Sequence, residues 1–276
     1  MRAGIRQQLI NSKIGIIDCY EPNVPNKETP KPYAVVLQND DIKNNETVGF
    51  KRTIEIYFYV KRTSFKSLDE IVDKAIKALH MQTIEDPKTN EVFTCIFNGI
   101  VGQDGIDEEW DALYRGLQFN VIALHDETEE NTDKWLDSIK DFTSKLTDLP
   151  IYLNTWQKNF AVPSILWRVQ NQSKERESNT LVKENKTLIC HIVSESKSQI
   201  SELIDNIEDN LIDSFKIPYD LVDRRYLTIE SINEDREADM LTKGQLTVEL
   251  FRRRMVKRKI GPIIEEINIR GTLKEG

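Results

Sequence analysis

Two hydrophobic periods alternate along this chain, and each predicts a different kind of element. The run RTIEIYFYV (52–60) places apolar and polar residues at alternate positions, the pattern of a strand with one buried face. The run SFKSLDEIVDKAIKAL (64–79) instead repeats its apolar residues every three to four positions, which predicts an amphipathic helix. Ser67 and Glu70 have the spacing of a capping box at the start of this helix.

The same order of elements occurs twice. In the first half we expect a helix over 5–14, strands over 33–38 and 52–60, a helix over 64–79 and strands over 92–97 and 117–124. In the second half we expect a helix over 135–146, strands over 164–170 and 186–193, a helix over 200–211 and strands over 226–232 and 244–251. Matching positions, offset by roughly 130 residues, are Leu68 and Ile200, Pro32 and Pro163, and Gly116 and Gly244.

This repeat predicts an α+β protein of two tandem similar domains, each a mostly antiparallel sheet of about four strands packed with two helices. A single larger α+β domain is the alternative. We place the N-terminal domain at 1–125 and the second domain, of the same topology, at 134–251. The acidic run DETEENTD (126–133) cannot bury apolar area and is interpreted as a linker between them. Residues 252–276 remain as a basic C-terminal arm.

Charge is distributed unevenly between these parts. The 276 residues carry 38 Lys and Arg against 46 Asp and Glu, a formal net charge of −8. The C-terminal arm nevertheless has eight basic and three acidic side chains, so it carries +5 and the remainder −13. An acidic body argues against a protein whose whole surface binds nucleic acid, because phosphate binding needs a positive field.

The basic cluster that follows the last expected strand has three readings. It is a solvated extension of the strand, a site for a nucleic-acid backbone, or a surface that docks onto the acidic body of a neighbouring copy. Three consecutive arginines cannot all face one side of an extended chain, so some are expected to be exposed or paired with acidic residues. Isoleucines follow in the same arm, which we expect to add to another subunit or to fold back as an extra strand. The candidate subunit-interface residues are Arg252, Arg253, Arg254, Lys257, Arg258, Lys259, Ile263, Ile264, Ile267 and Ile269.

Residues that would carry catalysis or hold a metal do not form a recognisable set. The chain has no phosphate-binding loop, dinucleotide fingerprint or nucleophile elbow, and the acidic loop QDGIDEEW (103–110) lacks the EF-hand spacing. Cys95 and Cys190 are expected to pack as small hydrophobes, and His191 as a packed or edge histidine. We therefore expect no enzyme activity, no metal and no cofactor. No run of ~18 apolar residues predicts a membrane span, and the start of the chain does not look like an export signal, so we expect a soluble intracellular product.

Parts of the first half resemble the tail terminator, or tail completion, proteins of tailed bacteriophages. The resemblance lies in IRQQLI, in PKPYAVVLQ, in RTIEIYFYVKRTSFKSLDEIVDKAIKAL and in YRGLQFNVIAL. It covers residues 5–125, and residues 133–251 follow only in topology. Two such halves in one chain are similar to the terminators of contractile, myovirus-type tails.

The resemblance implies a structural virion protein without catalytic residues. It implies a homo-oligomer, a hexameric ring, that caps the tail tube, ends its elongation and joins the tail to the neck. The implied partners are the tail tube, the sheath and the neck or head-completion proteins, with DNA passing through without specific binding and no membrane contact. The implied location is the tail–neck junction of the virion, after synthesis in the host cytoplasm. A neck or head-completion connector, or a nucleic-acid-binding module that uses the C-terminal basic cluster, remain the alternatives.

Overall fold

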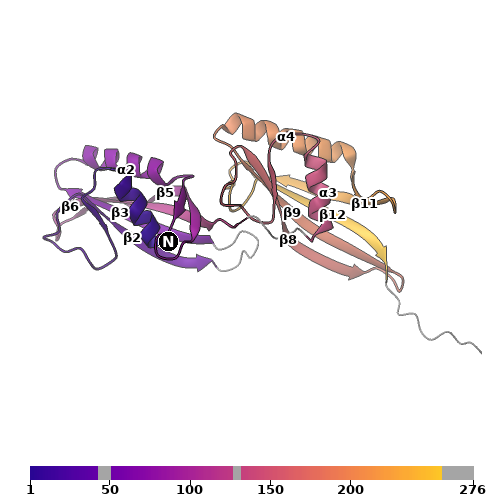
Figure 1. Ribbon diagram of the computed structural model, residues 1–276, viewed down its shortest axis with the longest axis horizontal. Coiled ribbons are helices and arrows are strands. Elements are labelled where there is room, and N and C mark those ends of the chain that lie inside the picture. Colours follow the sequence, from indigo (N-terminus) through magenta and orange to yellow (C-terminus); the bar gives the residue numbers. More distant parts are fainter. Residues whose placement is uncertain (43–50, 127–131, 257–276) are drawn as a thin grey trace, which may run out of the picture.

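Two six-stranded sheets, each with helices on one face, form the described part of this computed structural model, residues 1–42, 51–126 and 132–256 (Figure 1). The first domain contains α1 (Arg2–Asn11), β1 (Asp18–Tyr20), β2 (Tyr33–Ile42), β3 (Lys51–Lys61), α2 (Phe65–Leu79), β4 (Thr83–Glu85), β5 (Val92–Asp107) and β6 (Ala112–Ala123). Its strands lie in the order β1-β2-β3-β6-β5-β4, and every neighbouring pair is antiparallel except β1 with β2.

The second domain repeats this arrangement element by element. It contains α3 (Lys134–Thr143), β7 (Ile151–Leu153), β8 (Ser164–Arg176), β9 (Leu181–Val193), α4 (Lys197–Ser214), β10 (Lys216–Asp220), β11 (Arg225–Glu234) and β12 (Leu246–Met255). The order β7-β8-β9-β12-β11-β10 is that of the first sheet, and again only the first pair, β7 with β8, is parallel. The predicted class, two tandem α+β domains with mostly antiparallel sheets, is confirmed.

Each sheet has two more strands than the hydrophobic pattern predicts. The additional strands, β1, β4, β7 and β10, are three to five residues long and form the edges of the sheets. Strands this short contain too few residues to show a period of two, so the four longer strands of each domain were the only ones that alternation could reveal.

Two of the three predicted repeat positions are equivalent in the structure. Leu68 is the fourth residue of α2, as Ile200 is of α4. Pro32 and Pro163 each follow a cis peptide bond and directly precede β2 and β8. The match of Gly116 with Gly244 is wrong, since Gly116 lies within β6 opposite Tyr57 whereas Gly244 precedes β12.

Helix α2 shows how the apolar stripe sets the core. The side chains of Leu68, Ile71, Val72, Ala75 and Leu79 are buried and pack on the helix-covered face of the first sheet. The predicted capping box is wrong, because the helix begins earlier and Ser64 is its N-cap, accepting a hydrogen bond from the amide of Lys66. The hydroxyl of Ser67 donates back to the carbonyl of Ser64 at 3.1 Å.

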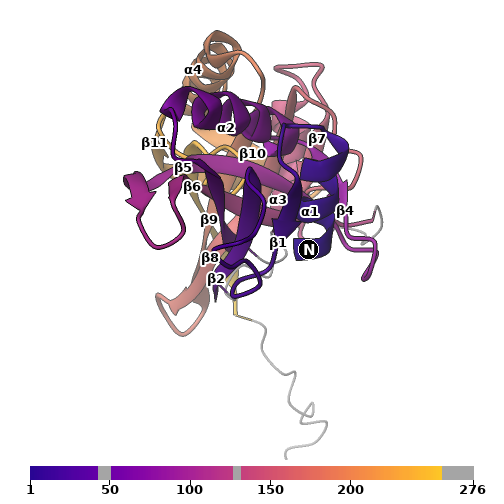
Figure 2. The same ribbon diagram turned by 90° about the vertical axis from the view of Figure 1, so that its left-hand side faces the viewer.

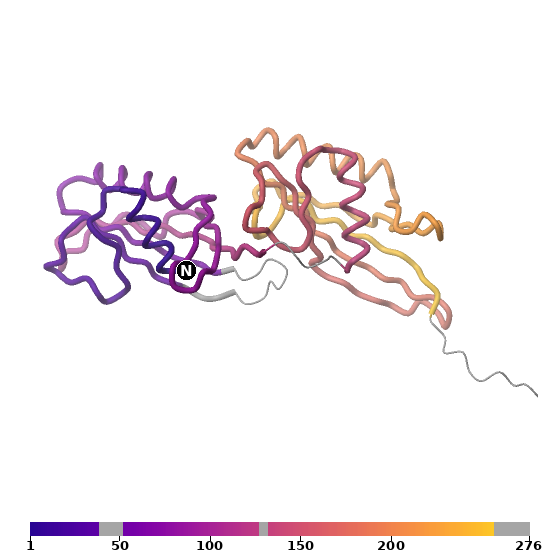
Figure 3. The backbone as a smooth tube through the Cα atoms, in the orientation of Figure 1, coloured from indigo at the N-terminus to yellow at the C-terminus, as the bar shows by residue number. Residues whose placement is uncertain are grey.

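A third apolar cluster joins the two domains. From the first domain it takes Ile96, Ile122 and Leu124, and from the second Trp156, Leu166, Val193 and Leu241. The amide of His125 donates to the carbonyl of Trp156 at 2.9 Å, and the amide of Lys158 donates to the carbonyl of His125 at 2.8 Å. Helices α2 and α4 lie on the same side of the molecule (Figure 2), and the smooth trace in Figure 3 follows the chain from one domain to the other.

The acidic run 126–133 lies mostly outside the described residues, which omit 127–131. Its last residue, Asp133, is the N-cap of α3 and accepts a hydrogen bond from the amide of Trp135 at 3.0 Å. Within the described ranges, no helix has both the length and the apolar composition required to cross a membrane.

Candidate functional site

The three arginines of the predicted interface belong to the last strand of the second sheet. Strand β12 runs through Met255 and pairs with β9 over its whole length, with Arg252 opposite Glu184 and Arg254 opposite Val182. Residues 252–255, which the sequence predicts as the start of the C-terminal arm, are therefore part of β12 and pair with β9. The other predicted interface residues, Lys257, Arg258, Lys259, Ile263, Ile264, Ile267 and Ile269, lie outside the described residues.

Strand alternation directs Arg252 and Arg254 to the helix-covered side of the sheet, where both bind one carboxylate. The side chain of Glu184 is 7% exposed, and its two oxygens lie 2.7 Å from Arg252 Nη2 and 2.7 Å from Arg254 Nε. Lys174 Nζ lies 3.7 Å from the same carboxylate. Three cations around one carboxylate leave this end of the sheet with an excess of positive charge.

Two aromatic rings complete this basic site. The guanidinium of Arg252 lies 4.3 Å from the ring centroid of Tyr219 and 5.6 Å from that of Trp135. Lys186 Nζ lies 5.5 Å from the Trp135 ring and pairs with Asp133. Together these side chains line a depression of about 400 Å³. Cations held over aromatic faces are attracted to the ring quadrupole, which orders them without neutralising their charge.

Arg253 points to the opposite face of the same strand. It forms a bidentate pair with Glu177, at 2.8 Å from Nε to Oε2 and 2.9 Å from Nη2 to Oε1. Its guanidinium lies 5.2 Å from the ring of Phe251. The three arginines therefore divide between the two faces, as expected, and each of them pairs with an acidic side chain. Because the Arg253 side chain is 50% exposed, its pair contributes little to stability.

We expect the Glu184 carboxylate to make the second domain sensitive to acid. Burial opposes ionisation of Glu184, but hydrogen bonds and charge from Arg254 and Arg252 outweigh it and hold the pKa of the carboxyl below its ordinary value. A lowered folded-state pKa gives stability that is complete above the unfolded pKa of about 4.3 and is lost as the pH falls through the folded value. Glu184→Gln should cost about 1–2 kcal/mol at pH 7 and remove this part of the acid dependence.

Urea unfolding at pH 7 and at a series of acidic pH values measures both effects. The matched control is Glu230→Gln, which removes an exposed partner of Lys183 on the other face and should change stability by less than about 0.5 kcal/mol. Equal effects of the two substitutions at neutral pH would contradict the role given to Glu184.

The acidic loop 103–110 is part of a hairpin that is tied to helix α2. Arg115 Nε donates to Asp104 Oδ1 at 2.6 Å, and Arg115 also lies 2.8 Å from Asp69 of α2. The hydrogen bond from Arg115 lowers the pKa of Asp104. Among the described residues, no group of three or more His, Cys, Asp or Glu side chains is arranged to hold a metal ion.

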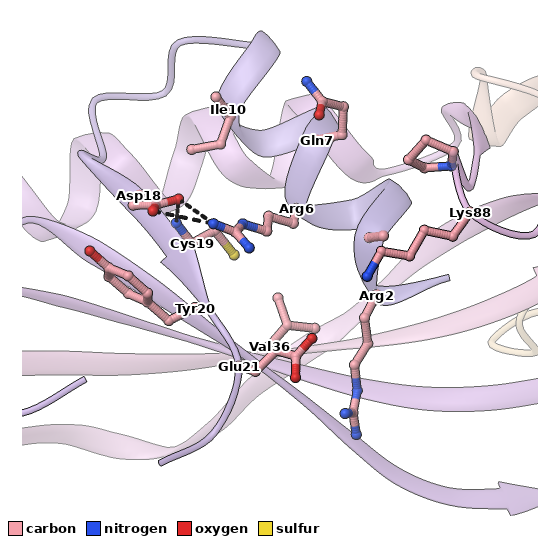
Figure 4. A pocket seen from close by; sticks show the side chains of 12 residues that line it. Arg2, Arg6, Gln7, Ile10, Asp18, Cys19, Tyr20, Glu21, Val36 and Lys88 are labelled. Carbon is pink, nitrogen blue, oxygen red and sulfur yellow. Dashed lines mark hydrogen bonds and ion pairs between the residues drawn. The ribbon is translucent and has the colours of Figure 1, made fainter. Parts of the chain in front are cut away.

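A second depression, of about 360 Å³, lies between α1 and β1 in the first domain (Figure 4). Arg2, Arg6 and Lys88 line it together with Asp18 and Glu21, and Arg6 reaches Asp18 at 3.0 Å. Opposite charges are therefore mixed within the same pocket, and the pocket does not favour a ligand of either sign. The sequence held no signal for it, because its lining comes from separate segments.

A buried polar pair at the junction of the domains also escaped the sequence patterns. Arg168, only 4% exposed, donates from Nε to Nε2 of His191 at 2.8 Å, so the imidazole is neutral and accepts at that atom. Burial, and then the charge of Arg168, lower the pKa of His191 to about 3. The other ring nitrogen lies 3.0 Å from the carbonyl of Met240, and Arg168 Nη2 donates to the carbonyl of Thr242 at 3.4 Å.

This pair positions the loop between β11 and β12, which carries Leu241 into the shared apolar cluster. His191 is packed in the core, as its strand pattern predicted, and Cys95 and Cys190 are buried thiols as expected. A signal for Arg168 exists in the sequence, as it is a charged residue inside the apolar strand SILWRVQ, but its partners come from a distant loop.

No protein-family model matches the chain, and no curated protein matches it. Among solved structures, a similar chain comes from the "virion of native gene transfer agent (GTA) particle". The two chains are 15% identical with a TM-score of 0.35, over 45% of this chain and 93% of that one. At this level of similarity, function has to be inferred from the residues of this chain.

Proposed function

We propose that this protein is a structural virion subunit that forms a hexameric ring, caps the phage tail tube, ends its elongation and joins the tail to the neck. The observation that carries the proposal is the complete repeat of one α+β topology, β1 to β6 and then β7 to β12. It accords with the resemblance of residues 5–125 to tail terminator proteins and with the second half following the same topology. The partners on this proposal are the tail tube, the sheath and the neck proteins.

The charge distribution of the chain supports assembly from identical copies. One end of the second sheet gathers Lys174, Lys186, Arg252 and Arg254, while the chain as a whole is acidic. A heterologous contact between a basic surface and an acidic surface, repeated around an axis, closes into a ring. A ring whose lumen is acidic would also let DNA pass without specific binding.

Native mass spectrometry and negative-stain imaging of the full chain test the proposal directly. We expect a closed hexamer at micromolar concentration, and we expect its addition to growing tail tubes to stop their elongation. A protein that stays strictly monomeric and leaves tube growth unchanged would refute the ring function.

Nucleic-acid binding is the second candidate, favoured by the basic and aromatic lining of the depression beside Arg252. Phosphate binding by several cations gives an affinity that falls steeply as salt rises. We expect no such dependence for this chain, and no change when the six basic residues between 252 and 259 are replaced by Gln. A steep salt slope that disappears in the six-residue variant would favour the nucleic-acid function instead.

A further inference from the structure

Aromatic side chains gather on the face of the first sheet that the helices leave open. Tyr33 stacks on Tyr59 with ring centroids 5.0 Å apart, and Tyr59 lies 5.7 Å from Trp110 and 5.8 Å from Tyr114. Tyr57 extends the row, 6.4 Å from Tyr114. All but Tyr33 are partly exposed, so the faces and edges of several rings are open to a partner.

The phenol hydroxyls of this aromatic row differ in their hydrogen-bond partners. The side chain of Tyr33 is fully buried, yet its hydroxyl has no hydrogen-bond partner among the described residues. The hydroxyl of Tyr57 donates to Glu55 at 3.0 Å, and burial followed by this hydrogen bond raises the pKa of Tyr57 to about 12. Burial, and then the charges of Asp107 and Tyr114, also raise the pKa of Tyr59. These phenols stay neutral and keep oxygen atoms that can accept hydrogen bonds from a cationic group.

Carboxylates surround the same end of the sheet. The turn between β5 and β6 holds Asp107, Glu108, Glu109 and Asp111, the last three with exposed side chains. Asp107 accepts a hydrogen bond from the backbone amide of Trp110 at 2.9 Å, which orders the turn that carries the indole and the carboxylates. We call the aromatic row (Tyr33, Tyr57, Tyr59, Trp110, Tyr114) and the turn 107–111 together the acidic cradle. Carboxylates next to Tyr and Trp rings are the chemistry that binds Arg and Lys.

The cradle and the basic end of the second sheet lie at opposite ends of the molecule (Figure 1). Strand β6 runs from Tyr114 toward Ile122 in the shared cluster, about 30 Å at 3.4 Å per residue. Strand β12 then starts near the same cluster and runs a similar length, about 30 Å, to Met255. The next basic residues, Lys257 to Lys259, reach at most about 11 Å beyond Val256. They cannot bind the cradle of their own chain.

We propose that the acidic cradle of one copy binds the basic segment Lys257–Lys259 of a second copy, so that copies join head to tail. Arg252 and Arg254 already bind Glu184, and Arg253 binds Glu177, so they extend the strand rather than supply the contact. The segment that follows adds three positive charges within three residues, against four carboxylates in the turn 107–111. This inference rests on the proposed ring function, for which it names the repeated contact.

Two complementary variants test the contact in the full chain. The cradle variant carries Glu108→Gln, Glu109→Gln and Asp111→Asn, and the segment variant carries Lys257→Gln, Arg258→Gln and Lys259→Gln. Each variant alone should raise the dissociation constant for self-association by roughly 100-fold. An equimolar mixture of the two variants should form a one-to-one dimer, because the intact segment of the cradle variant binds the intact cradle of the segment variant. The other cradle and the other segment carry the substitutions, so the dimer cannot extend.

A matched control carries the same change of charge on helix α4 of the second domain. Glu202→Gln, Asp209→Asn and Asp213→Asn remove three exposed carboxylates from α4 and should leave assembly as in the unmodified chain. Circular dichroism verifies that each variant is folded. A further variant, Trp110→Leu, should weaken assembly by roughly tenfold through loss of the aromatic face.

The outcomes separate this inference from the function on which it rests. If the unmodified chain forms rings and the cradle and segment variants form them equally well, the head-to-tail contact is overturned and the ring function stands. If the mixture yields no dimer although each variant is monomeric, the contact is overturned as well. If the unmodified chain is monomeric and has no effect on tail tubes, the ring function itself fails. Loss of DNA binding in the segment variant with assembly unchanged would assign that segment to nucleic acid.

Discussion

Replacing Trp156 with alanine is expected to lower the free energy of unfolding by about 3–5 kcal/mol. The indole is fully buried in the cluster that joins the two domains, and its Nε1 donates to the carbonyl of Leu241 at 3.3 Å. Phe160 packs against it with ring centroids 4.8 Å apart. The substitution removes the largest side chain of a small interface and leaves a cavity between the domains, so the two domains should also unfold more independently.

Urea unfolding followed by circular dichroism measures the loss, because tryptophan fluorescence changes with the substitution itself. We expect the two domains of the Trp156→Ala variant to unfold in separate steps and those of the unmodified chain to unfold together. Tyr226→Ala is the control, since it removes an aromatic ring that is 43% exposed, outside the junction and the acidic cradle, and should cost less than about 1.5 kcal/mol. Equal losses of unfolding free energy for the two variants would show that the junction contributes no more to stability than an exposed ring does.

Replacing Gly244 with alanine should cost about 3–4 kcal/mol, for two separable reasons. The backbone of Gly244 has φ of +79°, which a residue with a Cβ adopts only at a cost. A Cβ there would also lie 2.4 Å from Ile189 Cγ2 and 2.7 Å from the carbonyl oxygen of Cys190. The clash with backbone of β9 cannot be relieved by a side-chain rotation, so the start of β12 must shift.

Gly102→Ala separates these two contributions. Gly102 has φ of +67°, but a Cβ at that position would meet no atom within 4 Å. Its substitution should therefore show the backbone cost alone, about 1 kcal/mol, in the same unfolding experiment. A loss for Gly244→Ala no larger than that for Gly102→Ala would mean that the strand β12 adjusts freely, contrary to the expectation.

Two predictions from the sequence are wrong for the same physical reason. Gly116 and Gly244 match by residue type, but Gly116 lies inside β6 opposite Tyr57 and Gly244 lies before the first residue of β12, because register depends on the strand opposite. Ser67 has the spacing of a capping residue, but the N-cap is Ser64. Which serine caps the helix depends on where strand β3 ends and the helix can begin. In both cases a local signal was correct in kind and wrong in position.

The predicted interface shows the same division. Alternation along a strand is enough to predict that the three arginines cannot share one face and that some are exposed or paired with acidic residues. That both neighbours share Glu184 could not be predicted, since Glu184 lies 68 and 70 positions earlier in the chain. The acidic cradle likewise combines β2, β3 and β6, whose tyrosines look like ordinary strand residues in isolation.

Hydrophobic periods and composition predict the helices and the eight longer strands in their order, the duplication of one α+β unit and the excess of positive charge at the C-terminal end. These properties follow from hydrophobic periods and composition, which are local and can be read along the chain. The tertiary structure is needed to show that Trp156 packs between the domains and that Arg168 and His191 hold the loop that carries Leu241 there. It also shows that the acidic cradle and the basic end lie too far apart to meet within one molecule. Those properties depend on contacts and distances between residues far apart in sequence, which no local period records.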